Sequence, residues 1–106
     1  QTSANTPAVT VAAVYSDSKV TITGTKGTGD AFSFNKATAV AGETIIVTDS
    51  DGATVDGAIT FGGTSTAPTI VFTPGEGEET PTAVTVTSGL KDNNNVSVTP
   101  KTISLA

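Results

Sequence analysis

Apolar and polar residues alternate along most of this chain in short runs, which recur about every ten to twelve residues. A period of two places every second side chain on the same face of a strand, so each run predicts a β-strand with one buried face. Eight or nine short strands are expected, and no segment keeps the apolar spacing of a helix of useful length. The apolar members are Val9, Val11 and Ala13; Val20 and Ile22; Phe32 and Phe34; Ile45 and Val47; Ile59 and Phe61; Ile70 and Phe72; Val84 and Val86; Val96 and Val98; and Ile103 and Leu105.

The segments between these runs carry turn-forming residues. Ser16-Asp17-Ser18 predicts a hairpin turn, and Asp49-Ser50-Asp51-Gly52 and Asp92-Asn93-Asn94-Asn95 predict turns held by Asx hydrogen bonds. One longer acidic loop, with Glu76, Glu78 and Glu79, is expected between Pro74 and Pro81. Many short strands at regular spacing, separated by such turns, are typical of a β-sandwich or barrel.

Length and composition favour a single folded domain. Thr (22), Val (12) and Ile (6) dominate the 106 residues, and β-branched side chains suit a pleated, half-buried surface. We expect Gln1 to Pro7 to form a linker and residues 8–106 to form one domain. Its predicted core comprises Val20, Ile22, Phe32, Phe34, Ile45, Val47, Ile59, Phe61, Ile70, Phe72, Val84 and Val86.

The charge balance disfavours two classes of partner. Ten acidic residues face five lysines and no arginine, which gives a formal net charge of −5. Because the lysines are scattered, no basic patch is expected that would neutralise nucleic-acid phosphates or bind an anionic membrane. No stretch approaches the roughly 20 apolar residues of a membrane-spanning helix, so membrane insertion is not expected either.

From about Val20 onward, the order of the motifs resembles one known family. Ile46-Val47-Thr48-Asp49-Ser50-Asp51-Gly52 is followed by Val55-Asp56-Gly57-Ala58-Ile59-Thr60-Phe61, by Thr69-Ile70-Val71-Phe72-Thr73-Pro74 and by Thr85-Val86-Thr87-Ser88-Gly89-Leu90-Lys91-Asp92. This succession is similar to that of the bacterial immunoglobulin-like domains of surface-layer and other cell-envelope proteins. The resemblance implies an all-β, immunoglobulin-like Greek-key sandwich of seven to nine strands. The segment 96–106 is then the last strand of this domain or the start of a neighbour, and we favour the last strand because Ile103 and Leu105 need a partner.

The same resemblance implies a function. It predicts a structural, non-catalytic module of a surface-layer type protein outside the bacterial cell, which acts as a spacer and assembly domain. Its expected partners are neighbouring immunoglobulin-like domains and copies of the same surface protein. The alternative is a binding module of an adhesin, or of a phage capsid or tail decoration, that engages host-surface polymers.

Catalytic chemistry has little support in the residue inventory. The chain has no His and no Cys, so a Ser or Thr nucleophile lacks an imidazole base and a thiolate is excluded. The carboxylates of Glu76, Glu78 and Glu79 lie on a predicted solvated loop rather than in an apolar pocket that would raise a pKa. An intramolecular Lys–Asn isopeptide bond would need a buried acid beside the pair; Lys36 and Lys101 are its candidates, although no motif selects them. We therefore expect no enzyme activity.

Calcium is the most specific ligand that the sequence suggests, although we expect that no cofactor is required. Calcium takes six to eight oxygen ligands from carboxylates, amides and carbonyls. The family resemblance implies calcium at junctions between domains, which makes the candidates Asp49, Asp51, Asp56 and Asp92. Asp49 does not open an EF-hand, because the Gly falls two places early and Thr60 stands where the Glu should be. The competing interpretation is that these Asp residues only form turns.

Overall fold

The computed structural model describes residues 8–27 and 29–105 and is all-β. The predicted linker, residues 1–7, lies outside the described residues. One short 3-10 turn, Lys36–Thr38, is capped by the Asn35 side chain, which accepts from the backbone N–H of Ala37. No helix within the described ranges is long and apolar enough to cross a membrane. The strands are β1 (Val9–Ser16), β2 (Lys19–Lys26), β3 (Ile45–Thr48), β4 (Gly57–Gly63), β5 (Pro68–Pro74), β6 (Ala83–Val86) and β7 (Lys101–Ser104).

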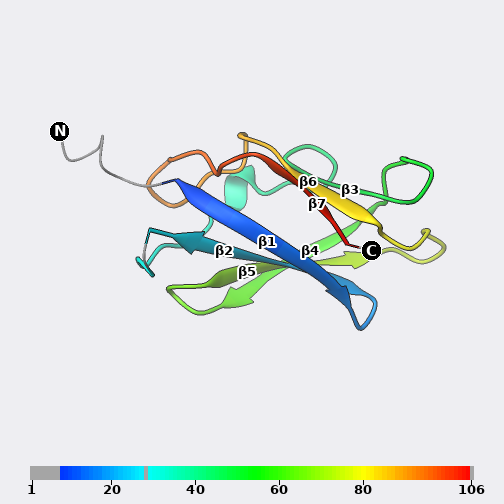
Figure 1. The fold of residues 1–106 in the computed structure, drawn as a ribbon, viewed down its shortest axis with the longest axis horizontal. Helices are drawn as coiled ribbons and strands as arrows, with labels where there is room; N and C mark the ends of the chain where they lie inside the picture. Colours follow the sequence, from blue (N-terminus) through cyan, green and yellow to red (C-terminus); the bar gives the residue numbers. More distant parts are fainter. Residues whose placement is uncertain (1–7, 28, 106) are drawn as a thin grey trace.

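The strands form two antiparallel sheets (Figure 1). One sheet has the order β1-β2-β5-β4 and the other has the order β3-β6-β7. Within each sheet, the register places buried side chains opposite one another on neighbouring strands: Val20 lies opposite Phe72, Ile22 opposite Ile70, and Ile45 opposite Val86. The segment around Lys101 pairs with β6, so the C-terminal run is the last strand of this fold, as favoured from the sequence.

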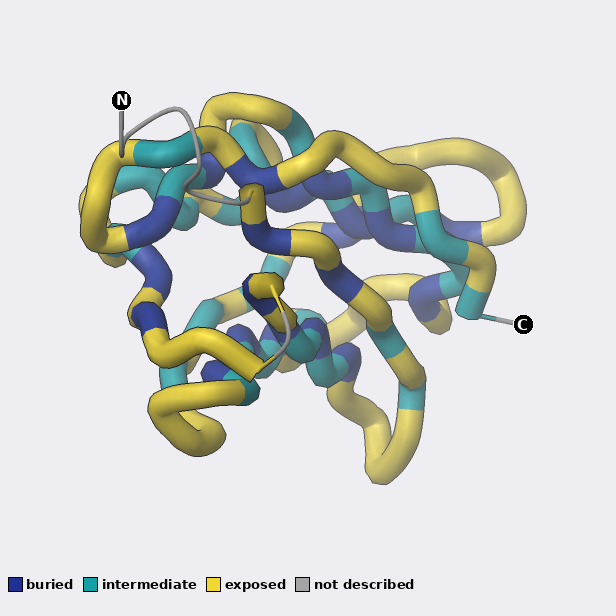
Figure 2. The backbone as a smooth tube through the Cα atoms, turned by 60° about the vertical axis from the view of Figure 1, so that its left-hand side comes forward, coloured by how far each residue is buried: buried dark blue, intermediate teal, exposed yellow. Residues whose placement is uncertain are grey.

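A single apolar core lies between the two sheets, and its buried positions alternate along the strands (Figure 2). Ten of the twelve predicted core residues are buried. The prediction was wrong for Ile59 and Phe61, which are only partly buried and pack against the core. Both belong to β4, which lies at the edge of its sheet, so its inner face is less covered. The core also includes Val9, Val11, Val55, Leu90 and Val98.

Two of the nine alternating runs do not form strands, which leaves seven of the eight or nine strands expected. Phe32 and Phe34 are buried, but their segment makes only one isolated bridge, between Phe34 and Asp92. Val98 is buried as well, and its segment has a single bridge between Lys91 and Ser97. Each segment is too short to extend a sheet, because turns follow or precede it within a few residues. The period-two pattern therefore identified buried side chains here, but not the ladder that defines a strand.

The connections gather at two ends of the molecule (Figure 1). The Asp49 end contains the β1–β2, β3–β4 and β5–β6 connections, and hydrogen bonds from Gly75 N to Asp56 O and from Thr82 N to Thr48 O tie the last two together. The Lys26 end contains the connections that follow β2 and β6 and the β4–β5 turn, tied by bonds from Phe32 N to Ser65 O and from Asn35 N to Lys91 O. Strand β1 begins at the Lys26 end, and β7 finishes at the Asp49 end.

Candidate functional site

The most unusual polar feature is a lysine and an aspartate buried together at the Lys26 end. Lys26 closes β2, and Nζ of Lys26 donates a hydrogen bond of 2.5 Å to Oδ2 of Asp92. The two residues are 3% and 0% exposed, and this is the only ion pair within residues 8–27 and 29–105. Charged groups are almost never buried to this degree unless they are paired.

Local structure brings both side chains to this position. Every second residue of β2 faces the core, and this set comprises Val20, Ile22, Gly24 and Lys26. Alternation along the strand therefore directs the Lys26 side chain toward the core. Asp92 begins the turn Asp92–Asn95, where its Oδ1 accepts from the backbone N–H groups of Asn94 and Val96 at 2.8 and 3.0 Å. The positive φ of Asn95, 67°, completes the turn. The Asp92 carboxylate thus stabilises its own turn through Oδ1 and binds the end of β2 through Oδ2.

Gly24 makes room for the aromatic residues beside this pair. A Cβ at Gly24 would lie 2.6 Å from Phe34 Cζ and 2.9 Å from Phe32 Cζ. The two rings meet edge to face, with centroids 5.5 Å apart. Both rings are buried.

Opposing effects act on the pKa of Asp92. Burial raises it by disfavouring the charged form, whereas the Lys26 hydrogen bond, the Val96 and Asn94 backbone N–H groups and the Lys26 charge lower it. The hydrogen bonds and the charge prevail, so the pKa of Asp92 lies below its ordinary value of 3.8. Asp92 is therefore ionised at neutral pH.

The same geometry limits what the pair can do chemically. Amide condensation of the two side chains would require a neutral amine and a neutral acid, whereas the environment favours the ionised carboxylate. The other buried carboxylate among the described residues is Asp49, which lies at the opposite end. No neighbouring acid is therefore in place to carry protons. Lys36 and Lys101, the isopeptide candidates, are both exposed, and Nζ of Lys36 lies 5.3 Å from the centroid of the Phe61 ring.

The four calcium candidates are not brought together. Asp49, Asp51 and Asp56 lie at the Asp49 end, whereas Asp92 lies at the Lys26 end with its carboxylate already bonded. Oδ1 of Asp49 accepts from the N–H groups of Asp51 and Ala53 at 2.8 and 3.1 Å, which is the expected Asx bonding of a turn. The described residues contain no group of three or more acidic side chains placed to hold a metal ion.

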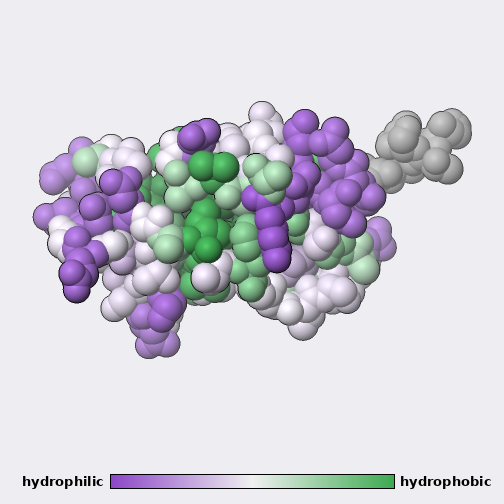
Figure 3. Space-filling view, turned by 180° about the vertical axis from the view of Figure 1, so that it is seen from behind, coloured by the Kyte–Doolittle hydropathy of each residue, from purple (hydrophilic) through white to green (hydrophobic). Residues whose placement is uncertain are grey.

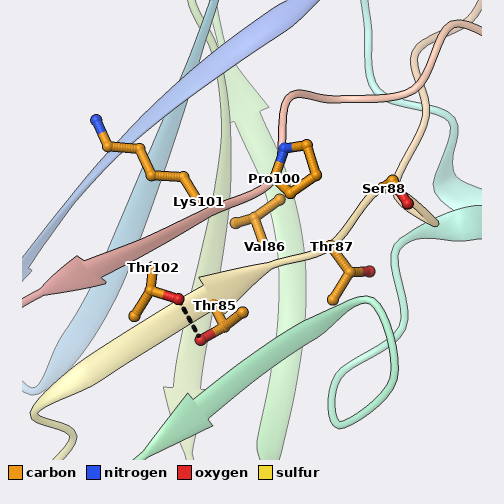
Figure 4. A pocket seen from close by; sticks show the side chains of 7 residues that line it. All are labelled: Thr85, Val86, Thr87, Ser88, Pro100, Lys101 and Thr102. Atoms are coloured by element: carbon orange, nitrogen blue, oxygen red, sulfur yellow. Dashed lines mark hydrogen bonds between the residues drawn. The ribbon is translucent and has the colours of Figure 1, made fainter.

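A shallow groove crosses β6 and β7 (Figure 4). Its lining combines apolar surface with hydroxyl side chains: hydroxyls of Thr85 and Thr102 lie 3.1 Å apart, and Thr87 and Ser88 continue the groove toward the Lys26 end. Lys101 supplies its one charged side chain. The groove contains no acid, base or nucleophile in an activating environment.

The predicted core does not include Lys26, although the sequence carries a signal for it. Lys26 continues the phase of Val20 and Ile22 across Gly24, so its side chain had to face the core. The sequence predicts Asp92 as a calcium candidate or a turn residue, whereas the structure also pairs it with Lys26. No protein-family model, curated protein or solved structure matches this chain.

Proposed function

We propose that this chain is a structural, non-catalytic module of the immunoglobulin-like class, which acts as a spacer and assembly domain of a bacterial cell-surface protein of the surface-layer type. The observation that carries the proposal is the strand order. In a constant-type immunoglobulin sandwich, strands A-B-E-D form one sheet and C-F-G the other. In chain order, β1-β2-β5-β4 and β3-β6-β7 correspond to those two sets.

The path of the chain supports a role as a spacer. Strand β1 starts at one end of the molecule and β7 finishes at the other (Figure 1). Copies linked in one polypeptide would therefore extend end to end rather than fold back. Each copy would also transmit tension along its strands, where the ladder hydrogen bonds lie perpendicular to the pull.

The outer face of the larger sheet supports an assembly role. Apart from Lys19, which lies beside the β1–β2 turn, its outward-facing positions carry no charge, so another surface can approach most of this face without desolvating an ion. The uncharged positions are Thr10, Ala12, Val14, Ser16, Thr21, Thr23, Thr25, Ala58, Thr60, Gly62, Thr69, Val71 and Thr73. Val14, at 57% exposed, is the most exposed large apolar side chain among the described residues.

Calcium enters the proposal only at junctions between copies. Asp51 and Asp56 are exposed, while Asp49 is engaged in its own turn. A single copy thus offers only part of the oxygen shell that calcium requires. Oxygens from an adjacent copy would have to complete the shell.

Small-angle scattering tests the spacer proposal on polypeptides that carry one, two and three copies in tandem. The maximum dimension should increase by a constant step per copy, because entry and exit lie at opposite ends. A three-copy chain that is no longer than two copies would contradict the proposal.

The same chains should be melted in calcium and in chelator: calcium at a hundredfold excess over Kd adds about 2.7 kcal/mol where a site exists only in the folded state. We expect that shift in the tandem chains and little or none in the single copy.

A further inference from the structure

The charged residues of this protein are sorted between its two ends. The Asp49 end holds seven of the ten acidic residues and one lysine, Lys19, for a formal charge of −6. These acids are Asp17, Asp49, Asp51, Asp56, Glu76, Glu78 and Glu79. Between the ends, the back of the molecule shows an apolar patch, with much of the hydrophilic surface toward either end (Figure 3).

Contacts of the backbone place the acidic residues at one end. Gly75 N donates to Asp56 O, and Asp56 N donates to Oε1 of Glu78, so the β3–β4 and β5–β6 connections lie side by side. The register places Lys19 beside them, because the neighbouring Val20 lies opposite Phe72 near the end of β5. None of these seven carboxylates forms an ion pair with another described residue. The repulsion among them is therefore not relieved within the described part of the chain.

The Lys26 end holds the other four lysines. Lys26 is neutralised by Asp92. Lys36, Lys91 and Lys101 remain, against Asp30 and Glu43, which leaves a formal charge of +1. Lys36 and Lys101 are exposed and Lys91 is partly exposed, so their ammonium groups are accessible to a partner.

We infer that copies of this chain associate head to tail, with the acidic Asp49 end of one copy against the lysine-bearing end of the next. This deepens the proposed function, on which it rests, by naming the partner surface. Contact between two Asp49 ends would oppose charges of −6 and −6, whereas head-to-tail contact brings three free lysines against a carboxylate-rich end. The chain path agrees, because a following copy in one polypeptide would present its Lys26 end to the Asp49 end of the copy before it.

The proposed contact has two physical consequences. Screening limits the attraction to about 8 Å at physiological ionic strength, so the two ends must touch, and added salt must weaken the association. A head-to-tail contact also leaves one free end of each kind. It therefore produces open strings whose mean mass keeps rising with concentration, rather than a dimer of fixed size.

Sedimentation equilibrium on the single chain tests this inference, at concentrations up to about 1 mM, where a contact with a Kd of that order is half saturated. In low salt without calcium, we expect the mean mass to rise above 10.5 kDa without a plateau at the dimer, and to fall in about 0.5 M salt. Lys91→Gln/Lys101→Gln should lower the association constant by roughly twofold to thirtyfold. Lys19→Gln is the matched control: it also removes a lysine, but from the acidic end, so it should leave association unchanged or strengthen it.

Several results would overturn the inference. A monomer throughout the concentration range, a plateau at the dimer, or equal losses in Lys19→Gln and Lys91→Gln/Lys101→Gln would each contradict head-to-tail contact. Association that requires calcium would assign the acidic end to cation bridging instead. The scattering of tandem chains reports the proposed function separately, because linked copies extend whether or not free copies associate.

Discussion

The buried pair of Lys26 and Asp92 links two distant segments of this fold. It joins the end of β2 to the turn before β7, two segments that are 66 positions apart in the chain. Burying two charges is costly, and the mutual attraction offsets this cost only when each ion is well bonded. Asp92 has three donors, whereas the one hydrogen bond of the Lys26 ammonium among the described residues is to Asp92, so each side chain depends on the other.

Removing one partner should be far more damaging than removing both charges. Lys26→Met leaves the Asp92 carboxylate buried without its counter-ion and should lower the free energy of unfolding by about 3–5 kcal/mol. Lys26→Met/Asp92→Asn keeps an oxygen for the N–H groups of Asn94 and Val96 and removes the charge, so it should be more stable than the single variant. Urea unfolding measures both; a double variant that is less stable than Lys26→Met would contradict this account.

The lowered pKa of Asp92 predicts a stability loss in acid. Because the folded state depresses this pKa, the stabilisation is complete above the ordinary value of 3.8 and is lost as the pH falls through the folded-state pKa. The wild type and Lys26→Met/Asp92→Asn differ only at these two residues, so the contributions of all other groups cancel between them. The difference in unfolding free energy between the two proteins should therefore stay constant above the ordinary value and shift against the wild type below it. A difference that does not change with pH would show that the pair is not ionised.

Two glycines in strands should respond differently to an added methyl group. Gly24→Ala places a Cβ against Phe34 and Phe32, and this overpacking should cost about 1–3 kcal/mol. Gly62→Ala in β4 is the control, because its nearest neighbour is Thr69 Oγ1 at 3.4 Å. Its effect should be small, or stabilising by a few tenths of a kcal/mol, since Ala restricts the unfolded chain. Thermal melts measure both variants, and equal losses of stability in Gly24→Ala and Gly62→Ala would contradict a specific packing role of Gly24.

The positions of the strands could be predicted from the sequence, whereas the Lys26–Asp92 ion pair could not. Period-two alternation located all seven strands and most of the core, because each strand buries one face. It failed for the segments 32–34 and 96–98, where burial occurs without a ladder. It also overestimated burial for Ile59 and Phe61, because no pattern in the sequence says which strand lies at an edge. The partner of Lys26 depends on contacts between distant segments, which alternation does not encode.

The contrast between central and edge strands can be measured with two phenylalanines. Phe72 in β5 is fully buried, so Phe72→Ala should lower the unfolding free energy by about 3–5 kcal/mol. Phe61 in the edge strand β4 is only partly buried, so Phe61→Ala should cost clearly less. Equilibrium unfolding of both variants provides the comparison. A cost below about 1 kcal/mol for Phe72→Ala would mean that the register is wrong.

The molecule as a whole is organised along one direction. Its strands run lengthwise, its connections collect at two ends, and the chain enters at one end and leaves at the other. Charge follows the same direction, with most acids at the Asp49 end and most lysines at the Lys26 end. Different charges at opposite ends suit a module that is repeated end to end. It could not be read from composition alone, because the acidic and basic residues are interleaved along the sequence.

The proposed spacer role makes a prediction about tension, because the direction of the ladders decides how they are loaded. Tension between the termini pulls β1 along its own length against β2, so the eight paired positions of that hairpin resist together. The β6–β7 ladder, with four paired positions, is loaded in the same way. A pull between Ser18 and the C-terminus instead acts on two points at the Asp49 end and loads the contacts one after another.

Single-molecule force spectroscopy that compares these two pulling directions on the same chain tests the central claim most directly. A spacer that transmits tension in series predicts a distinctly higher unfolding force between the two termini than between Ser18 and the C-terminus. Equal forces, or a lower force between the termini, would contradict the claim that this fold is built to carry load along its length.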